Sequence, residues 1–143
     1  MQTTAITRLL YQFATVGATL LMVVGCNDQS PWDKEYACSG QERSSTYVQG
    51  QPNNEKVYPI DIDFHIRSDL ALVKSYQVRI NSTAGEQMNF SSKTGAFWVS
   101  GSFEPRTGAL EIVEGRSIAI DGIPQETRIS GRYRCVASGT ATS

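Results

Sequence analysis

The stretch VYPIDIDFHIR, residues 57–67, alternates apolar and polar side chains without interruption. In a β-strand, successive side chains point to opposite faces of the sheet. The alternation therefore predicts a strand with one buried and one solvated face. Pro59 near its start suits an edge or first position, because proline cannot donate to the ladder. The buried face would carry Tyr58, Ile60, Ile62, Phe64 and Ile66, and the solvated face Asp61, Asp63, His65 and Arg67.

The same period of two recurs along the chain, and no convincing amphipathic helix interrupts it. Turn-forming residues separate the alternating segments at spacings of about 8 to 12 residues, which is typical of an antiparallel meander. The expected turns are Asn53–Asn54, Ser82–Gly85, Lys93–Gly95, Pro105–Gly108, Glu114–Gly115 and Asp121–Gly122. The expected inward sets are Tyr36, Cys38 and Gly40; Leu72, Tyr76, Val78 and Ile80; Met88 and Phe90; Phe97, Val99 and Phe103; Leu110 and Ile112; Ile118 and Ile120; and Ile129, Gly131, Tyr133 and Cys135.

We therefore predict one all-β domain over residues 35–137, in which seven or eight strands close as a small barrel. Closure removes the unpaired edges that invite aggregation. A two-sheet β-sandwich is the alternative. The domain is distantly similar to lipocalin-type barrels, but it has no signature motif, so no function is transferred.

The chain has three cysteines, Cys26, Cys38 and Cys135. Cys38 lies on the apolar face of the first predicted strand and Cys135 on the apolar face of the last. If the meander closes, these two strands are neighbours, and a disulfide between the two cysteines would link them covalently. Two free buried thiols or a metal pair are the alternatives. No second CxxC and no histidine partner supports a metal.

The N-terminal segment has the layout of an export signal. Residues 1–8 carry one positive charge, Arg8, and Leu9–Gly25 carry none. This apolar run is short for a spanning helix but fits a secretory leader. At its end, Val23-Val24-Gly25-Cys26 resembles the lipobox of bacterial lipoprotein precursors. An uncleaved anchor or a signal cut elsewhere is the alternative.

The resemblance implies that residues 1–25 are removed and that Cys26 is diacylated on sulfur and acylated on its new amine. Residues 26–34 would then form a lipidated cysteine and short tether, and residues 138–143 a frayed tail. The implied location is the bacterial cell envelope, with a periplasm-facing domain held by palmitate-type chains. Asn27 rather than aspartate follows the cysteine, which favours the outer over the inner membrane.

Composition and motifs argue against several kinds of function. A formal net charge of −1 does not indicate nucleic-acid binding. His65 is the single histidine, and no nucleophile motif accompanies it, so an envelope hydrolase is the less favoured reading and no cofactor is expected. Asp61, Asp63 and His65 share a strand face and form a weak metal candidate, with solvated surface residues as the simpler interpretation.

Two surfaces remain as candidates for binding. Trp98 is an apolar residue on the polar, outward-facing side of its strand. The tether around Trp32 could pack over it as an alternative to a binding partner. Arg128, Arg132 and Arg134 form an outward row that either docks an anionic partner or pairs with acids such as Asp61, Asp63 or Glu35. We expect a binding or structural accessory domain whose partner is an envelope protein or glycan. The alternative is a carrier of a small apolar ligand, with a cavity lined by Tyr58, Ile60, Phe64, Tyr76, Phe97 and Tyr133.

Overall fold

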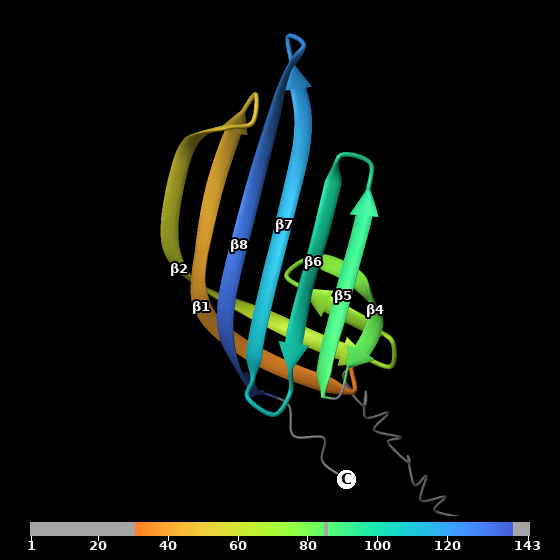
Figure 1. Ribbon diagram of the computed structural model, residues 1–143. Helices are drawn as coiled ribbons and strands as arrows, with labels where there is room; N and C mark the ends of the chain where they lie inside the picture. The colour runs from red at the N-terminus through yellow and green to blue at the C-terminus, as the bar shows by residue number, and fades with distance from the viewer. Residues whose placement is uncertain (1–30, 85, 139–143) are drawn as a thin grey trace, which may run out of the picture.

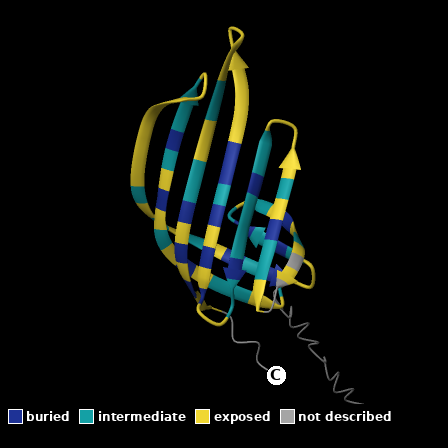
Figure 2. Ribbon diagram, viewed as in Figure 1, coloured by how far each residue is buried: buried dark blue, intermediate teal, exposed yellow. Residues whose placement is uncertain are grey.

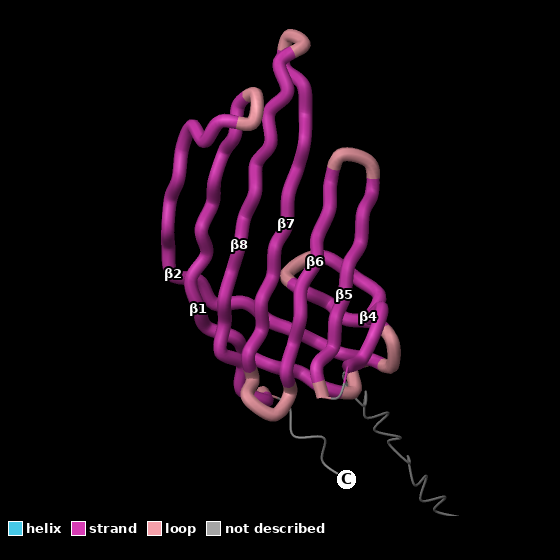
Figure 3. The backbone as a smooth tube through the Cα atoms, in the orientation of Figure 1, coloured by secondary structure: helices cyan, strands magenta, loops and turns pink. Residues whose placement is uncertain are grey.

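A computed structural model describes residues 31–84 and 86–138. The described chain forms eight antiparallel strands joined by short loops (Figures 1 and 3). Nowhere in this part of the chain does a helix occur that is long and apolar enough to cross a bilayer. The strands are β1 (Lys34–Val48), β2 (Gln51–Arg67), β3 (Leu70–Val73), β4 (Tyr76–Ala84), β5 (Gln87–Thr94), β6 (Phe97–Glu104), β7 (Ala109–Ile120) and β8 (Ile123–Ala137).

Each strand pairs with its neighbour in sequence, and β1 also pairs with β8, so the meander closes into a barrel. This confirms the prediction of an all-β barrel, and the sandwich alternative is not adopted. The connections between β1 and β2 and between β7 and β8 are two-residue hairpin turns. Gln49–Gly50 and Asp121–Gly122 both have positive φ at each position, as type I′ turns require.

Four local expectations are wrong. Ile118 and Ile120, expected to point inward to the core, are 38% and 47% exposed, because they lie in the part of β7 beyond the closed end of the ring. Asn53–Asn54 lies within β2, because the turn occurs earlier at Gln49–Gly50. Glu114–Gly115 lies within β7, which continues to Ile120. Leu72 does not share the inward face of Val78, because the chain turns at Lys74, which has a φ of 55°. The turn places Ala71 and Val73 in the core instead, both 0% exposed.

The ring is fully paired at only one end. β2 pairs with β1 along its whole length, but with β3 only from Phe64 to Arg67. The part of β2 that precedes Phe64 pairs only with β1, so the structure there is an open curved sheet. In this part, β1, β2, β7 and β8 extend well beyond β3 and β4 (Figure 1). Pro59 lies in this edge portion of β2, away from the start of the strand, where proline is tolerated.

Apolar side chains fill the closed end of the ring. Phe64 and Phe103 are 1% and 0% exposed, and their ring centroids lie 4.8 Å apart. Leu110 and Val73 are also fully buried. Burying one such side chain contributes about 1.5–3 kcal/mol. Buried positions alternate with exposed ones along the strands, while the β7–β8 hairpin tip is exposed (Figure 2).

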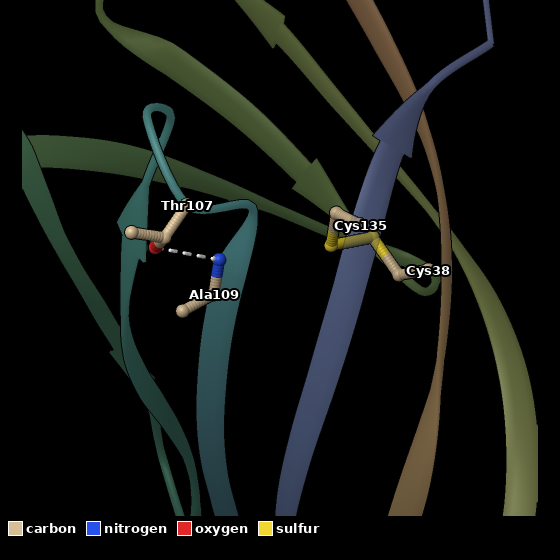
Figure 4. Close-up of a disulfide and its surroundings, with 4 residues drawn as sticks. All are labelled: Cys38, Thr107, Ala109 and Cys135. Carbon is tan, nitrogen blue, oxygen red and sulfur yellow. Dashed lines mark hydrogen bonds between the residues drawn. A yellow bond between two sulfur atoms is a disulfide. The ribbon is translucent and has the colours of Figure 1, made fainter.

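The predicted disulfide is confirmed. Cys38 and Cys135 are directly opposite residues of β1 and β8 and form the bridge shown in Figure 4. The nearby turn between β6 and β7 is held by a hydrogen bond from the Ala109 amide to the Thr107 hydroxyl, at 3.3 Å. Both ends of the described chain meet at this closed end, since the Ser138 amide donates to the Glu35 carbonyl.

Candidate functional site

A charged cluster lies inside the ring at the level where the closed end gives way to the open sheet. Glu42 on β1 is 2% exposed and Glu114 on β7 is 5% exposed, because both side chains point into the ring. Lys74, in the β3–β4 turn, reaches between them and forms ion pairs with both carboxylates. We call Glu42, Lys74, Glu114, Tyr58 and Tyr133 the mouth cluster.

Glycine at position 131 orients one member of the mouth cluster. Gly131 is the cross-strand partner of Glu42, and the Tyr133 ring lies over it. A Cβ at position 131 would overlap the Tyr133 hydroxyl. Without that Cβ, Tyr133 donates to one carboxylate oxygen of Glu42 while Tyr58 donates to the other at 2.9 Å. Both oxygens of Glu42 are therefore satisfied, as burial requires.

Glu114 is less completely satisfied. Its Oε1 accepts a hydrogen bond from Lys74 Nζ at 2.5 Å. Its Oε2 is buried and meets no donor in ideal hydrogen-bond geometry among the described residues, although the Tyr76 hydroxyl lies close enough to share the carboxylate. Leaving a buried charged acceptor without a donor costs about 1–3 kcal/mol or more. Glu114 is therefore less well satisfied than Glu42, and Lys74 and Tyr76 are the groups that interact with its carboxylate.

The pKa values show which protonation states the mouth cluster favours. Burial opposes ionisation of Glu42, but hydrogen bonds from Lys74, Tyr133 and Tyr58 outweigh it and lower the pKa. Burial also disfavours the Lys74 ammonium, yet hydrogen bonds to Glu114 and Glu42 outweigh it and raise the pKa. Burial, followed by the hydrogen bond to Glu42, raises the pKa of Tyr133. Charged lysine, charged Glu42 and neutral phenol are the favoured forms.

A second feature lies on the outer face of the sheet. Trp98 on β6 covers Gly115 on β7, where a Cβ would overlap the indole ring. The guanidinium carbon of Arg128 lies 5.7 Å from the Trp98 ring centroid and 5.9 Å from that of Tyr47. We call Tyr47, Arg128 and Trp98 the outer stack. Tryptophan, tyrosine and arginine are the residue types that most often dominate binding energy at interfaces.

Two grooves on the same outer face flank the outer stack. The first has a volume of about 530 Å³ and is lined by Gln41, Glu42, Arg43, Val57, Glu111, Ile112, Val113, Ser130, Gly131 and Arg132. The second has about 560 Å³ and is lined by Tyr47, Gly50, Ser117, Ile118, Ala119, Pro124, Gln125, Glu126 and Arg128. Most of the lining side chains alternate with the core residues along their strands and so point outward, which places both grooves outside the ring.

The predicted arginine row lies along this face, but its expected partners are wrong. Arg128 pairs with Glu126 at 2.9 Å and Arg132 with Glu111 at 3.2 Å. Arg134 donates to the Thr107 carbonyl. Asp61 and Asp63 are too far round the ring to take part, because they lie on β2, whereas β8 pairs with β1 and β7. Glu35 faces His65 instead, at 4.0 Å.

Trp98 and the tether do not meet. Trp32 stacks on His65 with ring centroids 5.7 Å apart and also contacts Arg67. Trp98 is instead packed within the outer stack. Asp61, Asp63 and His65 do share the outer face of β2, yet no three metal-binding side chains of histidine, cysteine, aspartate or glutamate cluster anywhere in residues 31–84 and 86–138.

The six residues proposed to line an apolar cavity all lie on the interior side of the ring. Phe64 and Tyr133 are buried in the packed core, and Tyr58, Ile60, Tyr76 and Phe97 are partly buried nearer the mouth. Tyr76 and Phe97 stack on each other with centroids 4.9 Å apart. At Phe64, neighbouring aromatic rings occupy the interior. Cys26, the proposed lipidation site, lies outside the described residues.

The mouth cluster was not predicted, although the sequence contains two signals of it. Glu42 continues the inward parity of Tyr36, Cys38 and Gly40, and Glu114 continues that of Leu110 and Ile112. A carboxylate on the apolar, inward-facing side of a strand is unusual unless it is paired with another group. Lys74 gave no signal, because its role depends on a turn that only the folded chain reveals.

Comparisons with known proteins give no relative. No family model matches the chain, and no curated protein or solved structure is significantly similar to it.

Proposed function

We propose that this protein is a lipid-anchored domain of the bacterial cell envelope that binds a partner through its outer face. The observation that carries the proposal is the outer stack between two grooves of about 530 and 560 Å³. Aromatic side chains with arginine, bordered by hollowed polar surface, resemble the composition of protein-binding surfaces.

The position of this face is consistent with an anchored domain. The described chain starts at the closed end of the ring, where β1 begins, and the β7–β8 hairpin lies at the opposite end (Figure 1). Residues on both strands of this hairpin line the second groove. A short tether from Cys26 would leave that end facing away from the membrane. Exposed Ile120 and Ile123, at 47% and 40%, add apolar surface there.

The charges favour a partially anionic partner, such as a glycan or an acidic protein surface. Arg43 and Arg132 flank the first groove, and their side chains are 60% and 86% exposed. Each has an exposed glutamate partner, but such pairs contribute only about 0–1 kcal/mol and so exchange readily. By contrast, the packed aromatic core at Phe64 disfavours the alternative of an apolar-ligand carrier, which needs an interior cavity of about 300 Å³ or more.

The anchor and the binding surface need separate tests. Cys26→Ala in the full chain should release the protein from the membrane fraction, and mass spectrometry of the wild type should find acyl chains on Cys26. A leader still attached to an unmodified Cys26 would refute the anchor.

For the surface, residues 27–143 serve as bait in envelope extract, since the ring, core and disulfide all lie within this span. We expect Arg43→Glu with Arg132→Glu to abolish capture of a partner. Arg79→Glu is the matched control, because Arg79 is an exposed arginine on β4, remote from both grooves. Equal capture by all three baits would refute the outer face as the binding surface.

A further inference from the structure

The first groove of the outer face lies over backbone that is already paired. Its lining side chains come from β1, β2, β7 and β8, and β1 and β8 each have a paired strand on both sides there. This part of the sheet therefore has no free edge for an extended peptide to join as a further strand. Recognition in the groove depends on side chains, and its volume of about 530 Å³ falls in the range of small-ligand sites, about 300–1,000 Å³.

A small residue produces the hollow. In the row of cross-strand partners that crosses the groove, Ser130 lies between Arg43 on β1 and Val113 on β7. Its side chain is shorter than that of either neighbour, so the surface dips at Ser130. Val57 continues the row on β2 and leaves its side chain 55% exposed in the lining. A ligand in the hollow would cover this apolar surface, which favours binding.

The charged side chains of the lining do not cancel. Arg43 and Arg132 contribute two positive charges, and Glu111 contributes one negative charge. Glu42 also borders the groove, but its carboxylate points into the ring, where Lys74 pairs with it. One positive charge therefore remains on the outer side, and it favours a ligand with one negative charge.

The two arginines can converge on one ligand group. Arg132 is two residues from Ser130, the cross-strand partner of Arg43, so the arginines are diagonal neighbours. Such positions lie about 7–8 Å apart, within reach of long side chains. Their present partners are exposed, with Glu55 at 3.7 Å and Glu111 at 3.2 Å, and pairs of this kind exchange readily. A carboxylate from a ligand fits between two guanidinium groups, each of which can bind it with two N–H donors.

The remaining polar groups of the lining fit hydroxyls. Glu111 can only accept hydrogen bonds, whereas Gln41 and Ser130 can both donate and accept them. A simple anion would leave these groups unused and would be repelled by Glu111. An uncharged polyol would leave the positive charge unused. A ring that carries one carboxylate and several hydroxyls uses all of them.

We propose, on the basis of the proposed outer-face function, that the first groove binds an acidic sugar unit of a glycan. The carboxylate of the sugar lies between Arg43 and Arg132. Its hydroxyls bond to Glu111, Gln41 and Ser130, and the carbon atoms of its ring cover Val57.

The experiment is an NMR titration of ¹⁵N-labelled residues 27–143 with methyl β-D-glucuronide, methyl β-D-glucoside and sodium acetate at constant ionic strength. The two glycosides differ only in the carboxylate, and acetate supplies the carboxylate without the ring. We expect saturable shifts in the amide signals of Gln41, Arg43, Ser130 and Arg132 with the glucuronide, in the millimolar range for so small a ligand. The glucoside and acetate should each bind at least about tenfold more weakly.

Two variants locate the site. Ser130→Leu should abolish saturable glucuronide shifts, because it fills the hollow and keeps both arginines. Arg132→Gln should weaken glucuronide binding at least about tenfold. Arg79→Gln is the matched control and should bind as the wild type does, because Arg79 is an exposed arginine outside the groove. Absence of saturable shifts with the glucuronide, or acetate or glucoside binding as tightly as the glucuronide, would overturn the proposal.

The outer-face function and this ligand class can fail separately. Capture of a protein that depends on Arg43 and Arg132, without glucuronide binding, would keep the outer-face function and overturn the acidic sugar. Saturable glucuronide shifts with equal capture by all three baits would keep the sugar site and overturn only the captured envelope partner.

Discussion

Replacing Lys74 with methionine tests whether the mouth cluster is a single buried charge network. Methionine keeps most of the side-chain volume but removes the ammonium. Glu42 and Glu114 would then face each other, 2% and 5% exposed, without a counter-ion. Removing one partner of a buried ion pair costs about 3–5 kcal/mol. Because the Lys74 side chain is 17% exposed, we expect the lower end, about 3 kcal/mol.

Urea denaturation at pH 7 measures this loss directly, and thermal unfolding should show a midpoint lowered by roughly 12 °C, at about 4 °C per kcal/mol. The matched control is Lys56→Met, since Lys56 is an exposed lysine on β2 and should change stability by at most about 0.5 kcal/mol. A loss below about 1 kcal/mol for Lys74→Met would mean that the ion pairs behave as surface pairs, and the reasoning would be refuted.

The pH dependence gives an independent check on the same variant. In Lys74→Met the two carboxylates repel each other, so one of them gains a proton more easily. The stability difference from the wild type should therefore shrink as the pH falls from 7 to 5. In the wild type, the raised pKa of Lys74 gives stability that is fully present below its ordinary value of 10.5 and is lost as the pH rises through the raised value. A difference that is constant between pH 5 and 7 would contradict the network.

Three further predictions address the acid limb, the seam and the outer stack. The lowered pKa of Glu42 gives stability that is present above its ordinary value of 4.5 and is lost as the pH falls through the lowered value, so Glu42→Gln should flatten this limb in acid denaturation. Replacing both Cys38 and Cys135 with serine should lower the free energy of unfolding by about 2–5 kcal/mol, because the bridge closes a loop with a sequence separation of 97; an unchanged urea midpoint would contradict this. Gly115→Val should lift the Trp98 ring and cost about 1–3 kcal/mol, and ¹⁹F NMR of 5-fluorotryptophan should show the Trp98 signal moving toward its solvent-exposed position.

Strand periodicity could be predicted well from the sequence. The alternation in residues 57–67 places Phe64 and Ile66 in the core, and the parity of Cys38 and Cys135 places their sulfurs together. These features depend on the fixed two-residue period of a strand, which is a local property of the backbone. The boundaries at Gln49 and Lys74 were harder, because tight hairpins there form without the glycine or asparagine that usually marks their first position.

The sequence by itself determined that the chain forms antiparallel strands with one apolar face, and that the outermost strands carry cysteines of matching parity. Only the tertiary structure decided that Lys74 meets Glu42 and Glu114, and that Arg128 lies between Trp98 and Tyr47. The physical reason is that these contacts depend on the register between strands that are distant in sequence. Register depends on the summed packing of the whole ring, which no local pattern contains.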